Sequence, residues 1–183
     1  SDVCSSDLDN SYTTSVLNNS FGITTATGSS VAINATGFGF AIPSNAVIDG
    51  VTVTIGRYSS SSSTSSYTRD NTVRLLKAGT ASGTNLAVTA TNWPTTETAL
   101  SYGGSTNLWG NTLTPSDVNA SNFGLSIVVN QSAAAFTTLT SYVDYVNITV
   151  TYTINGVLSW YTVSSGGSSI ATGSSMNPVG LAG

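Results

Sequence analysis

Few residues in this chain could carry out chemistry. It contains no histidine, which excludes a Ser-His-Asp triad, a Cys-His pair and any histidine-ligated metal site. Glycoside hydrolysis needs two positioned carboxylates, and the candidates are Asp49, Asp70, Glu97, Asp117 and Asp144. Most of these have a structural explanation, because Asp49 belongs to an Asp-Gly turn, Asp117 to a helix start and Asp144 to a strand. We therefore predict that the protein is not an enzyme.

Three aromatic residues are the candidates for binding a ligand. Trp93, Tyr102 and Trp109 fall in one loop-rich stretch, NWPTTETALSYGGSTNLWG. If their rings are exposed, they could stack on sugar rings while Asn and Thr side chains bond the sugar hydroxyls. The alternative is that both tryptophans fill the ends of the fold, since tryptophan is usually largely buried. We favour burial, whereas exposure would indicate a carbohydrate-binding module.

A structural calcium ion is the one cofactor that the sequence leaves open. Calcium prefers the oxygens of Asp, Asn and backbone carbonyl groups. Asp9 and Asn10 could converge with Asp144, or with Asp70, to supply such ligands. The alternative, which we favour, is that these side chains are solvated and hold no ion. No other cofactor is predicted.

Lys77 is the only lysine in the chain and follows two leucines. It could form an internal crosslink to Asn147 beside Asp144, as happens in some β-domains of surface proteins. The interpretation that we favour is an edge-strand lysine, whose charge discourages pairing between the sheets of different molecules.

The composition is typical of an all-β protein with little surface charge. Hydrophobic residues make up 39% of the 183 residues and charged residues 7%, against a usual charged share of about 25%. Thr, Val, Ile and Tyr, which suit a pleated sheet, are abundant, whereas several good helix formers are scarce. A net charge of −4 leaves no basic surface for phosphates, so we expect no nucleic-acid partner. No apolar run approaches the roughly 20 residues that span a bilayer, so we expect no membrane span.

Alternating patterns predict strands along most of the chain. VTVTI (51–55) alternates strictly after an Asp-Gly turn, and YVNITVTYTI (145–154) places Val146, Ile148 and Val150 on one face. Four more strands are predicted at FGFAI (38–42), TVRLLK (72–77), NLAVTAT (85–91) and FGLSIVVN (123–130). The spacing of these runs predicts an all-β fold, an antiparallel β-sandwich that is jelly-roll-like.

Two local patterns mark the end of the sandwich. LTPSDVNASNFG (113–124) predicts one short helix with Thr114 as its N-cap. After the turn pair Asn155-Gly156, the rest of the chain predicts a separate hairpin. We therefore predict a β-sandwich module at residues 9–154 and a second, truncated unit at residues 155–183.

Several stretches resemble modules of known proteins. Those of the sandwich are IPSNAVIDGVTVTI, TVRLLKAGTASGTN, NWPTTETALSYGGSTNLWGNTLTPSDVNASNFGLSI and SYVDYVNITVTYT. They resemble a β-sandwich module of large secreted Bacteroidota proteins, which also occurs in phage structural proteins and has no assigned chemistry. The tail LSWYTVSSGGSSIATGSSMNPVG resembles the first hairpin of an Ig-like module in such proteins. The resemblance implies a fragment of a multidomain protein that is exported by the type IX system.

The first residues resemble something other than native protein. DVCSSDL, from Asp2 to Leu8, is the translation of GAC GTG TGC TCT TCC GAT CT, which is similar to the end of a common sequencing adapter. We therefore expect residues 1–8 to be an adapter-derived tail of a metagenomic reading frame, with native sequence beginning near Asp9. On this interpretation Cys4, the single cysteine, has no function.

Together these patterns predict a non-enzymatic, extracellular or cell-surface module with a structural or adhesive role. The expected partners are a glycan or a protein on a surface, and neighbouring modules or subunits that pair through the sheet edges. A carbohydrate-binding module is the first alternative. The second is a subunit of an extracellular filament, in which the C-terminal hairpin adds a strand to another copy.

Overall fold

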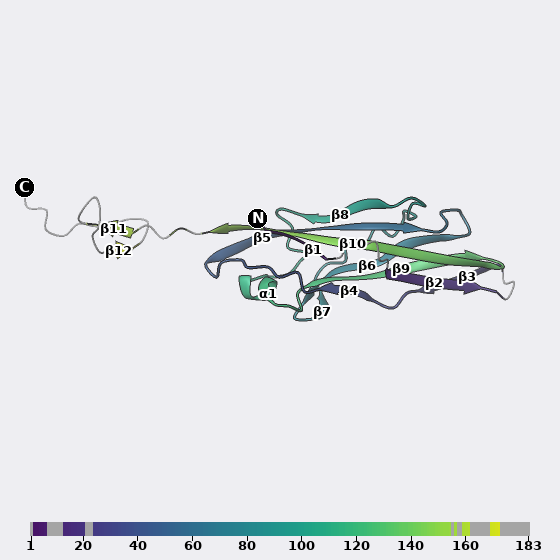
Figure 1. The fold of residues 1–183 in the computed structure, drawn as a ribbon, viewed down its shortest axis with the longest axis horizontal. Helices are drawn as coiled ribbons and strands as arrows, with labels where there is room; N and C mark the ends of the chain where they lie inside the picture. The colour runs from purple at the N-terminus through teal and green to yellow at the C-terminus, as the bar shows by residue number, and fades with distance from the viewer. Residues whose placement is uncertain are drawn as a thin grey trace, which may run out of the picture. The chain divides into compact units, whose positions relative to one another are not determined.

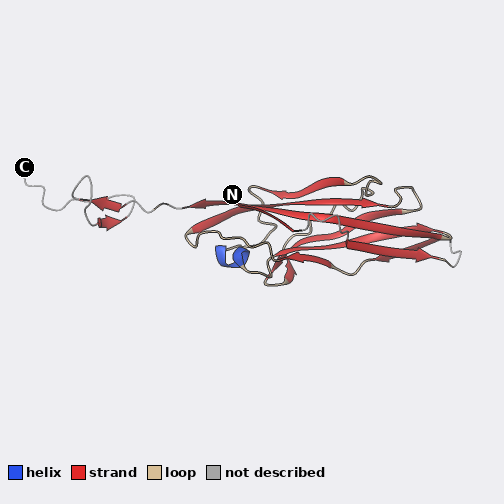
Figure 2. Ribbon diagram, viewed as in Figure 1, coloured by secondary structure: helices blue, strands red, loops and turns tan. Residues whose placement is uncertain are grey.

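The computed structural model describes residues 2–6, 13–20, 24–154, 156, 159–161 and 169–172. The chain divides into two compact units, Ser1–Thr153 and Ile154–Gly183. In the second unit, β11 (Ser159–Tyr161) pairs antiparallel with β12 (Ser169–Thr172). The first unit consists of two antiparallel sheets and one short helix (Figure 1, Figure 2).

Sheet A has the spatial order β1-β10-β5-β8, with β2 also paired to β10. Its strands are β1 (Asp2–Ser6), β2 (Thr13–Asn19), β5 (Ala46–Ser59), β8 (Thr98–Gly104) and β10 (Thr137–Ile154). β1 pairs with residues 146–150 of β10, and β2 pairs with residues 137–143. The short strands β1 and β2 therefore follow one another along a single edge of the sheet.

Sheet B has the spatial order β3-β9-β6-β7, with β4 also paired to β9. Its strands are β3 (Thr25–Ser29), β4 (Ile33–Thr36), β6 (Tyr67–Lys77), β7 (Thr80–Ser82) and β9 (Gly124–Ala134). Here too, two short strands share the edge of a longer one, because β3 pairs with residues 130–134 and β4 with residues 124–127.

The chain passes from one sheet to the other at most of its connections. β2 in sheet A leads to β3 in sheet B, β5 leads to β6, and β8, β9 and β10 alternate between the sheets. This connectivity, with each sheet four strands wide, is that of a jelly roll. The predicted all-β antiparallel sandwich is confirmed.

The core between the sheets consists of the predicted strand faces. The buried members are Val51, Val53 and Ile55 in β5 and Val146, Ile148 and Val150 in β10. In β10 the alternation changes phase at Asp144-Tyr145, because Val143 and Val146 are both buried. This shift, of the kind that a β-bulge produces, lies where the pairing of β10 passes from β2 to β1.

The predicted strand at residues 38–42 is wrong. Gly37 and Gly39 have left-handed φ angles of 80° and 71°, which interrupt the extended backbone that a strand requires. The apolar alternation nevertheless has a physical basis, because both phenylalanines of this stretch and Ile42 are buried. Its two phenyl rings stack with centroids 6.1 Å apart. The stretch therefore closes one end of the core without pairing as a strand.

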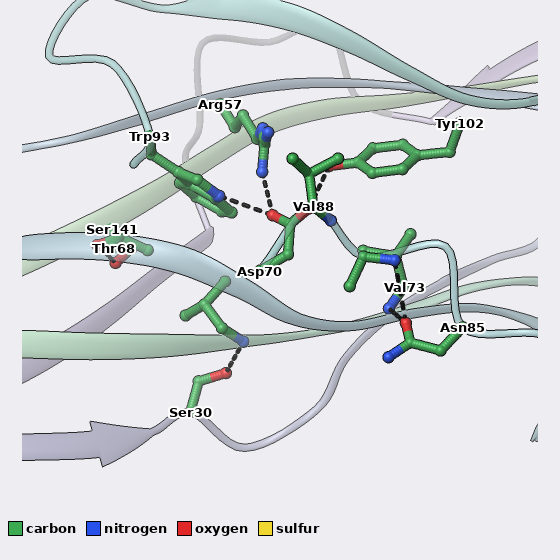
Figure 3. Close-up of polar contacts among 12 residues, drawn as sticks. Ser30, Arg57, Thr68, Asp70, Val73, Asn85, Val88, Trp93, Tyr102 and Ser141 are labelled. Carbon is green, nitrogen blue, oxygen red and sulfur yellow. Dashed lines mark hydrogen bonds and ion pairs between the residues drawn. The ribbon is translucent and has the colours of Figure 1, made fainter. Parts of the chain in front are cut away.

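The predicted strand at residues 85–91 is also wrong. The Asn85 side chain accepts the N–H of Val73 at 2.8 Å (Figure 3). The Leu86 N–H bonds the Val73 carbonyl at 3.0 Å. A backbone N–H of β6 is thus bonded by a side chain where a neighbouring strand would offer a backbone carbonyl, which interrupts a regular ladder.

The predicted short helix is confirmed as α1 (Pro115–Asn119). Thr114 Oγ1 accepts the Asp117 N–H at 3.2 Å, and the Asp117 carboxylate accepts the Thr114 N–H at 2.9 Å, which forms a capping box. Partial burial raises the pKa of Asp117, but the Thr114 hydrogen bonds and the Lys77 charge outweigh it, so the net pKa is lowered. The resulting stability is present above the ordinary Asp pKa and is lost as pH falls through the lowered value. No helix in the described ranges is long and apolar enough to cross a membrane.

Gly124→Ala is expected to destabilise the fold. Gly124 begins β9 opposite Thr36 of β4, and an added Cβ would overlap the Ala35 carbonyl group, which is backbone and cannot rotate away. We expect the free energy of unfolding to fall by about 2–3 kcal/mol in urea denaturation. The control is Gly104→Ala at the end of β8, where a Cβ would meet no atom within 4 Å. The control should change stability by less than about 0.5 kcal/mol, and equal losses would contradict the steric cause.

Candidate functional site

The three aromatic residues proposed to bind sugars lie inside the sandwich. Trp93 and Trp109 are 0% exposed and Tyr102 is 4% exposed. Trp109 Nε1 donates to the Val51 carbonyl at 2.8 Å, so its polar atom is used within the core. The less favoured hypothesis, in which these residues form an exposed sugar platform, is therefore wrong. The alternative, in which the tryptophans fill the fold, is confirmed.

Trp93 and Tyr102 belong to a cluster centred on Asp70, which we call the Asp70 cluster (Figure 3). Asp70, on the inner face of β6, is 0% exposed and forms an ion pair with Arg57 of β5. Its carboxylate also accepts the Trp93 Nε1–H, the Tyr102 hydroxyl and the Val88 backbone N–H, each at 2.8 Å. One carboxylate thus joins sheet A, sheet B and the segment between β7 and β8.

The positive charge of Arg57 offsets the negative charge of Asp70 within the Asp70 cluster. The Arg57 guanidinium lies 4.7 Å from the Trp93 ring centroid and 5.8 Å from that of Tyr102, both within cation–π range. Burial raises the pKa of Tyr102 far above its usual value; Arg57 lowers it and the Asp70 charge raises it further. Tyr102 therefore keeps its proton and remains a donor to Asp70. A carboxylate with this many donors has no free oxygen for the calcium ion that the sequence left open.

A second polar group, the hydroxyl network, lies beside the Asp70 cluster. Thr68 Oγ1 bonds Ser59 Oγ at 2.9 Å and Ser141 Oγ at 2.6 Å. Gln131 Nε2 donates to Ser141 Oγ at 2.7 Å and to the Ser15 carbonyl at 3.0 Å. These contacts connect β5, β6 and β10 with β9 and β2. The interior therefore changes from apolar to polar along the strands, since Val53, Ile55, Arg57 and Ser59 follow one another on the inner face of β5.

The other acids lie apart from this interior. Glu97 is exposed and contacts Asp144; desolvation, followed by the Asp144 charge and a hydrogen bond with that residue, raises the pKa of Glu97. Asp49 accepts the Thr153 hydroxyl at 2.7 Å. Asp9 and Asn10, the remaining candidate calcium ligands, lie outside the described residues. Within the described part of the chain, no three His, Cys, Asp or Glu residues are grouped as metal ligands.

Lys77 does not lie in a crosslinking site. Its Nζ donates to the Thr112 carbonyl at 2.8 Å and lies 3.3 Å from the Asp117 carboxylate. Asn147 belongs to β10 in the opposite sheet, where it pairs with β1. The hypothesis of a Lys77–Asn147 crosslink is therefore wrong. The edge-strand interpretation is wrong too, because β6 lies between β9 and β7 and Lys77 pairs with Thr80 of β7. The lysine helps to hold α1 against β6 instead.

The tyrosines on the outer faces of the sheets are the aromatic residues that sequence reasoning missed. Tyr58 and Tyr142 stack on sheet A with centroids 4.3 Å apart and 5° between their planes. On sheet B, the Arg69 guanidinium lies 4.2 Å from the Tyr67 ring centroid. Tyr67 directly follows the serine-rich stretch SSSSSTSS (59–66). This position beside a polar loop was the sequence feature that could have indicated an exposed aromatic residue. Surface aromatic groups therefore exist, but in strands rather than in the predicted loop.

The comparisons with known proteins leave the function open. No protein-family model matches the sequence, and no curated protein matches it. Among solved structures, the chain is similar to the structure of infectious bursal disease virus Gt strain, with a TM-score of 0.39 and 12% identity. The alignment covers 82% of this chain and 32% of the viral chain, so this chain spans about a third of the viral chain's length. We draw no functional conclusion from a similarity at this level.

Asp70→Asn is expected to cost about 3–5 kcal/mol of unfolding free energy, because it leaves the Arg57 charge buried without a counter-ion. The measurement is chemical denaturation at pH 7. The control is Asp117→Asn, which alters the more exposed pair with Lys77 and should cost no more than about 1 kcal/mol. A loss below 1 kcal/mol for Asp70→Asn would contradict the central role of this carboxylate.

Trp93 and Trp109 are expected to be protected from acrylamide quenching, because both are fully buried. Each is measured as the single tryptophan in a background in which the other and Trp160 are replaced by Phe. The quenching slope of each should be several-fold lower in the folded chain than in guanidinium chloride. A folded-state slope equal to the unfolded one would restore the interpretation of an exposed aromatic platform.

Proposed function

We propose that the first unit is a non-enzymatic structural module of an extracellular or cell-surface protein, with a role in display or adhesion. The observation that carries the proposal is the Asp70 cluster. In it, charged and aromatic side chains of a chain poor in charge bond one another between the two sheets. Their ion pair and hydrogen bonds join the two sheets into a rigid scaffold.

The positions of the basic residues support a role in a protease-rich environment. Arg57 lies in β5, and Arg69, Arg74 and Lys77 lie in β6. β5 lies between β10 and β8, and β6 pairs with β9 over residues 67–76 and with β7 over residues 75–77. Trypsin cleaves extended segments that have left their sheet, so cutting at any of these residues requires the fold to open. A folded chain of this kind resists such cleavage.

The structure bears differently on the two alternative functions, carbohydrate binding and filament assembly. Burial of Trp93, Tyr102 and Trp109 removes the residues on which carbohydrate binding was first predicted. The filament hypothesis stays a prediction: β11 and β12 pair with each other, and the rest of that hairpin lies outside the described residues.

The full chain is expected to survive trypsin and to leave polysaccharides uncut. Its half-life in trypsin should exceed that of Asp70→Asn by at least about 100-fold, the factor that a stability loss of roughly 3 kcal/mol implies. Incubation with a panel of polysaccharides should release no reducing ends above those of a Glu97→Gln/Asp144→Asn control, which removes the two contacting acids.

Two results would overturn the proposal. Reducing ends that are released by the wild type and lost in the Glu97→Gln/Asp144→Asn control would assign an enzymatic function. Equal trypsin cleavage of the wild type and Asp70→Asn would show that the Asp70 cluster does not secure the scaffold.

A further inference from the structure

The basic residues with no acidic partner lie on one face of the first unit. Arg57 is buried in the Asp70 cluster, and Lys77 pairs with an acid beside it. Arg69 and Arg74, both in β6, have no carboxylate within 4 Å among the described residues. In β6, Thr68 and Asp70 point into the sandwich, so Arg69 between them points outward. The outer face of sheet B therefore carries positive charge.

The pairing of β6, β9 and β3 places polar residues around Arg69. Arg69 lies opposite Asn130 of β9, which lies opposite Ser29 of β3. In the next outward row, Tyr67 and Thr27 flank Ser132. In the strands of sheet B the one acid is Asp70, which is buried, so no carboxylate of this sheet repels an anion on this face.

A groove of about 310 Å³ lies on this surface, and we call it the Tyr67 groove. It is lined by Thr27, Gly28, Ser29, Tyr67, Asn130 and Gln131. Its volume is at the lower end of the range of roughly 300–1,000 Å³ for small-ligand sites, which suits a small ligand or one portion of a longer chain. Tyr67 provides an aromatic wall, and Thr27, Ser29 and Asn130 are exposed polar groups.

Two contacts hold the Arg69 side chain beside this aromatic wall without any ligand. Its guanidinium lies 4.2 Å from the Tyr67 ring centroid, and its Nε donates to Asn92 Oδ1 at 2.7 Å. No hydrogen bond among the described residues uses its two terminal nitrogens. These nitrogens form the planar fork that binds a carboxylate or a sulfate through two parallel hydrogen bonds.

The neighbouring polar groups match sugar hydroxyls. Ser29 Oγ donates to Asn130 Oδ1 at 2.7 Å, which fixes the amide and leaves its NH₂ group toward other acceptors. Asn71 Nδ2 lies 3.5 Å from Ser29 Oγ and extends the same array. A sugar hydroxyl both donates and accepts, and so do the hydroxyl and amide side chains here.

We propose that the Tyr67 groove binds an acidic polysaccharide. The anionic group of the sugar, a carboxylate or a sulfate, pairs with Arg69, and the adjacent hydroxyls bond Ser29, Asn130 and Thr27. A nucleic acid fits less well, because two arginines neutralise few phosphates on a chain of net charge −4. The scaffold part of the proposed function requires no ligand, and this site goes beyond it by supplying the ligand contact that an adhesive role needs.

The test is affinity electrophoresis of the full chain in gels that contain polygalacturonate, dextran sulfate or neutral dextran. Retardation by at least one acidic polymer and none by dextran is expected, and the preferred polymer identifies the anion as carboxylate or sulfate. Arg69→Gln should weaken the interaction at least tenfold. Asn130→Ala should weaken it at least threefold, and both variants should keep the wild-type melting temperature within a few degrees.

Arg74→Gln is the matched control, because it removes the same charge from the same strand. Arg74 donates to the Gly83 carbonyl at 2.6 Å and lies opposite Ser126, whereas Arg69 borders the groove through its contact with Tyr67 and its pairing with Asn130, so affinity should fall less than twofold. Equal losses for the two arginine variants would overturn the site in favour of general charge attraction. Equal retardation by dextran, or no retardation by any polymer, would also overturn it. In that last case the scaffold proposal would still stand on its trypsin and reducing-end results.

Discussion

The carboxylate of Asp70 accepts hydrogen bonds from Tyr102 in sheet A and from Trp93 and Val88 in the segment between β7 and β8, and it pairs with Arg57 of β5. Burying a charge without its partners costs several kcal/mol, so the carboxylate is tolerable inside the sandwich only when all these donors are present. Both sheets and an irregular segment must therefore be in place together. This requirement couples distant parts of the chain into one cooperative unit.

Apolar and charged residues of the interior occupy separate positions along the strands, which supports this coupling. On the inner face of β5, the apolar residues Val53 and Ile55 precede Arg57; on β6, Asp70 precedes the apolar Val73 and Leu75. Because the charged residues occupy one level, a shift of either sheet would bury a charge against apolar side chains. Purely apolar faces would tolerate such a slip far better, so the polar interior specifies how the sheets are aligned.

Local sequence patterns predicted the long strands, from apolar alternation, and the helix cap, from Thr114 and Pro115. Both features depend on residues that are neighbours in the sequence. Arg57 could have been found as well, since it lies two residues after Ile55 on the buried face. Asp70 could not, because the register shift between Asp70 and Thr72 breaks its phase with Val73. The Tyr67 groove was also beyond reach, since it exists only through the pairing of β3, β9 and β6. Composition likewise could not decide whether the tryptophans are exposed, because that depends on the paths of two segments, one before β8 for Trp93 and one after it for Trp109.

The pairing of β1 with β10 has a mechanical consequence for the chain as given, in which the adapter-like residues 1–8 include β1. Asp2 lies opposite Val150, so the first strand begins beside the end of the last one and the backbone enters and leaves this unit at the same end. Tension applied through the two ends would open the β1–β10 ladder one hydrogen-bonded pair at a time, as in a zipper, instead of shearing many bonds at once. The edge of sheet A would yield first, while β5 and β6, which carry the buried ion pair, lie outside that path. A pulled molecule would thus lengthen in steps before its centre gives way.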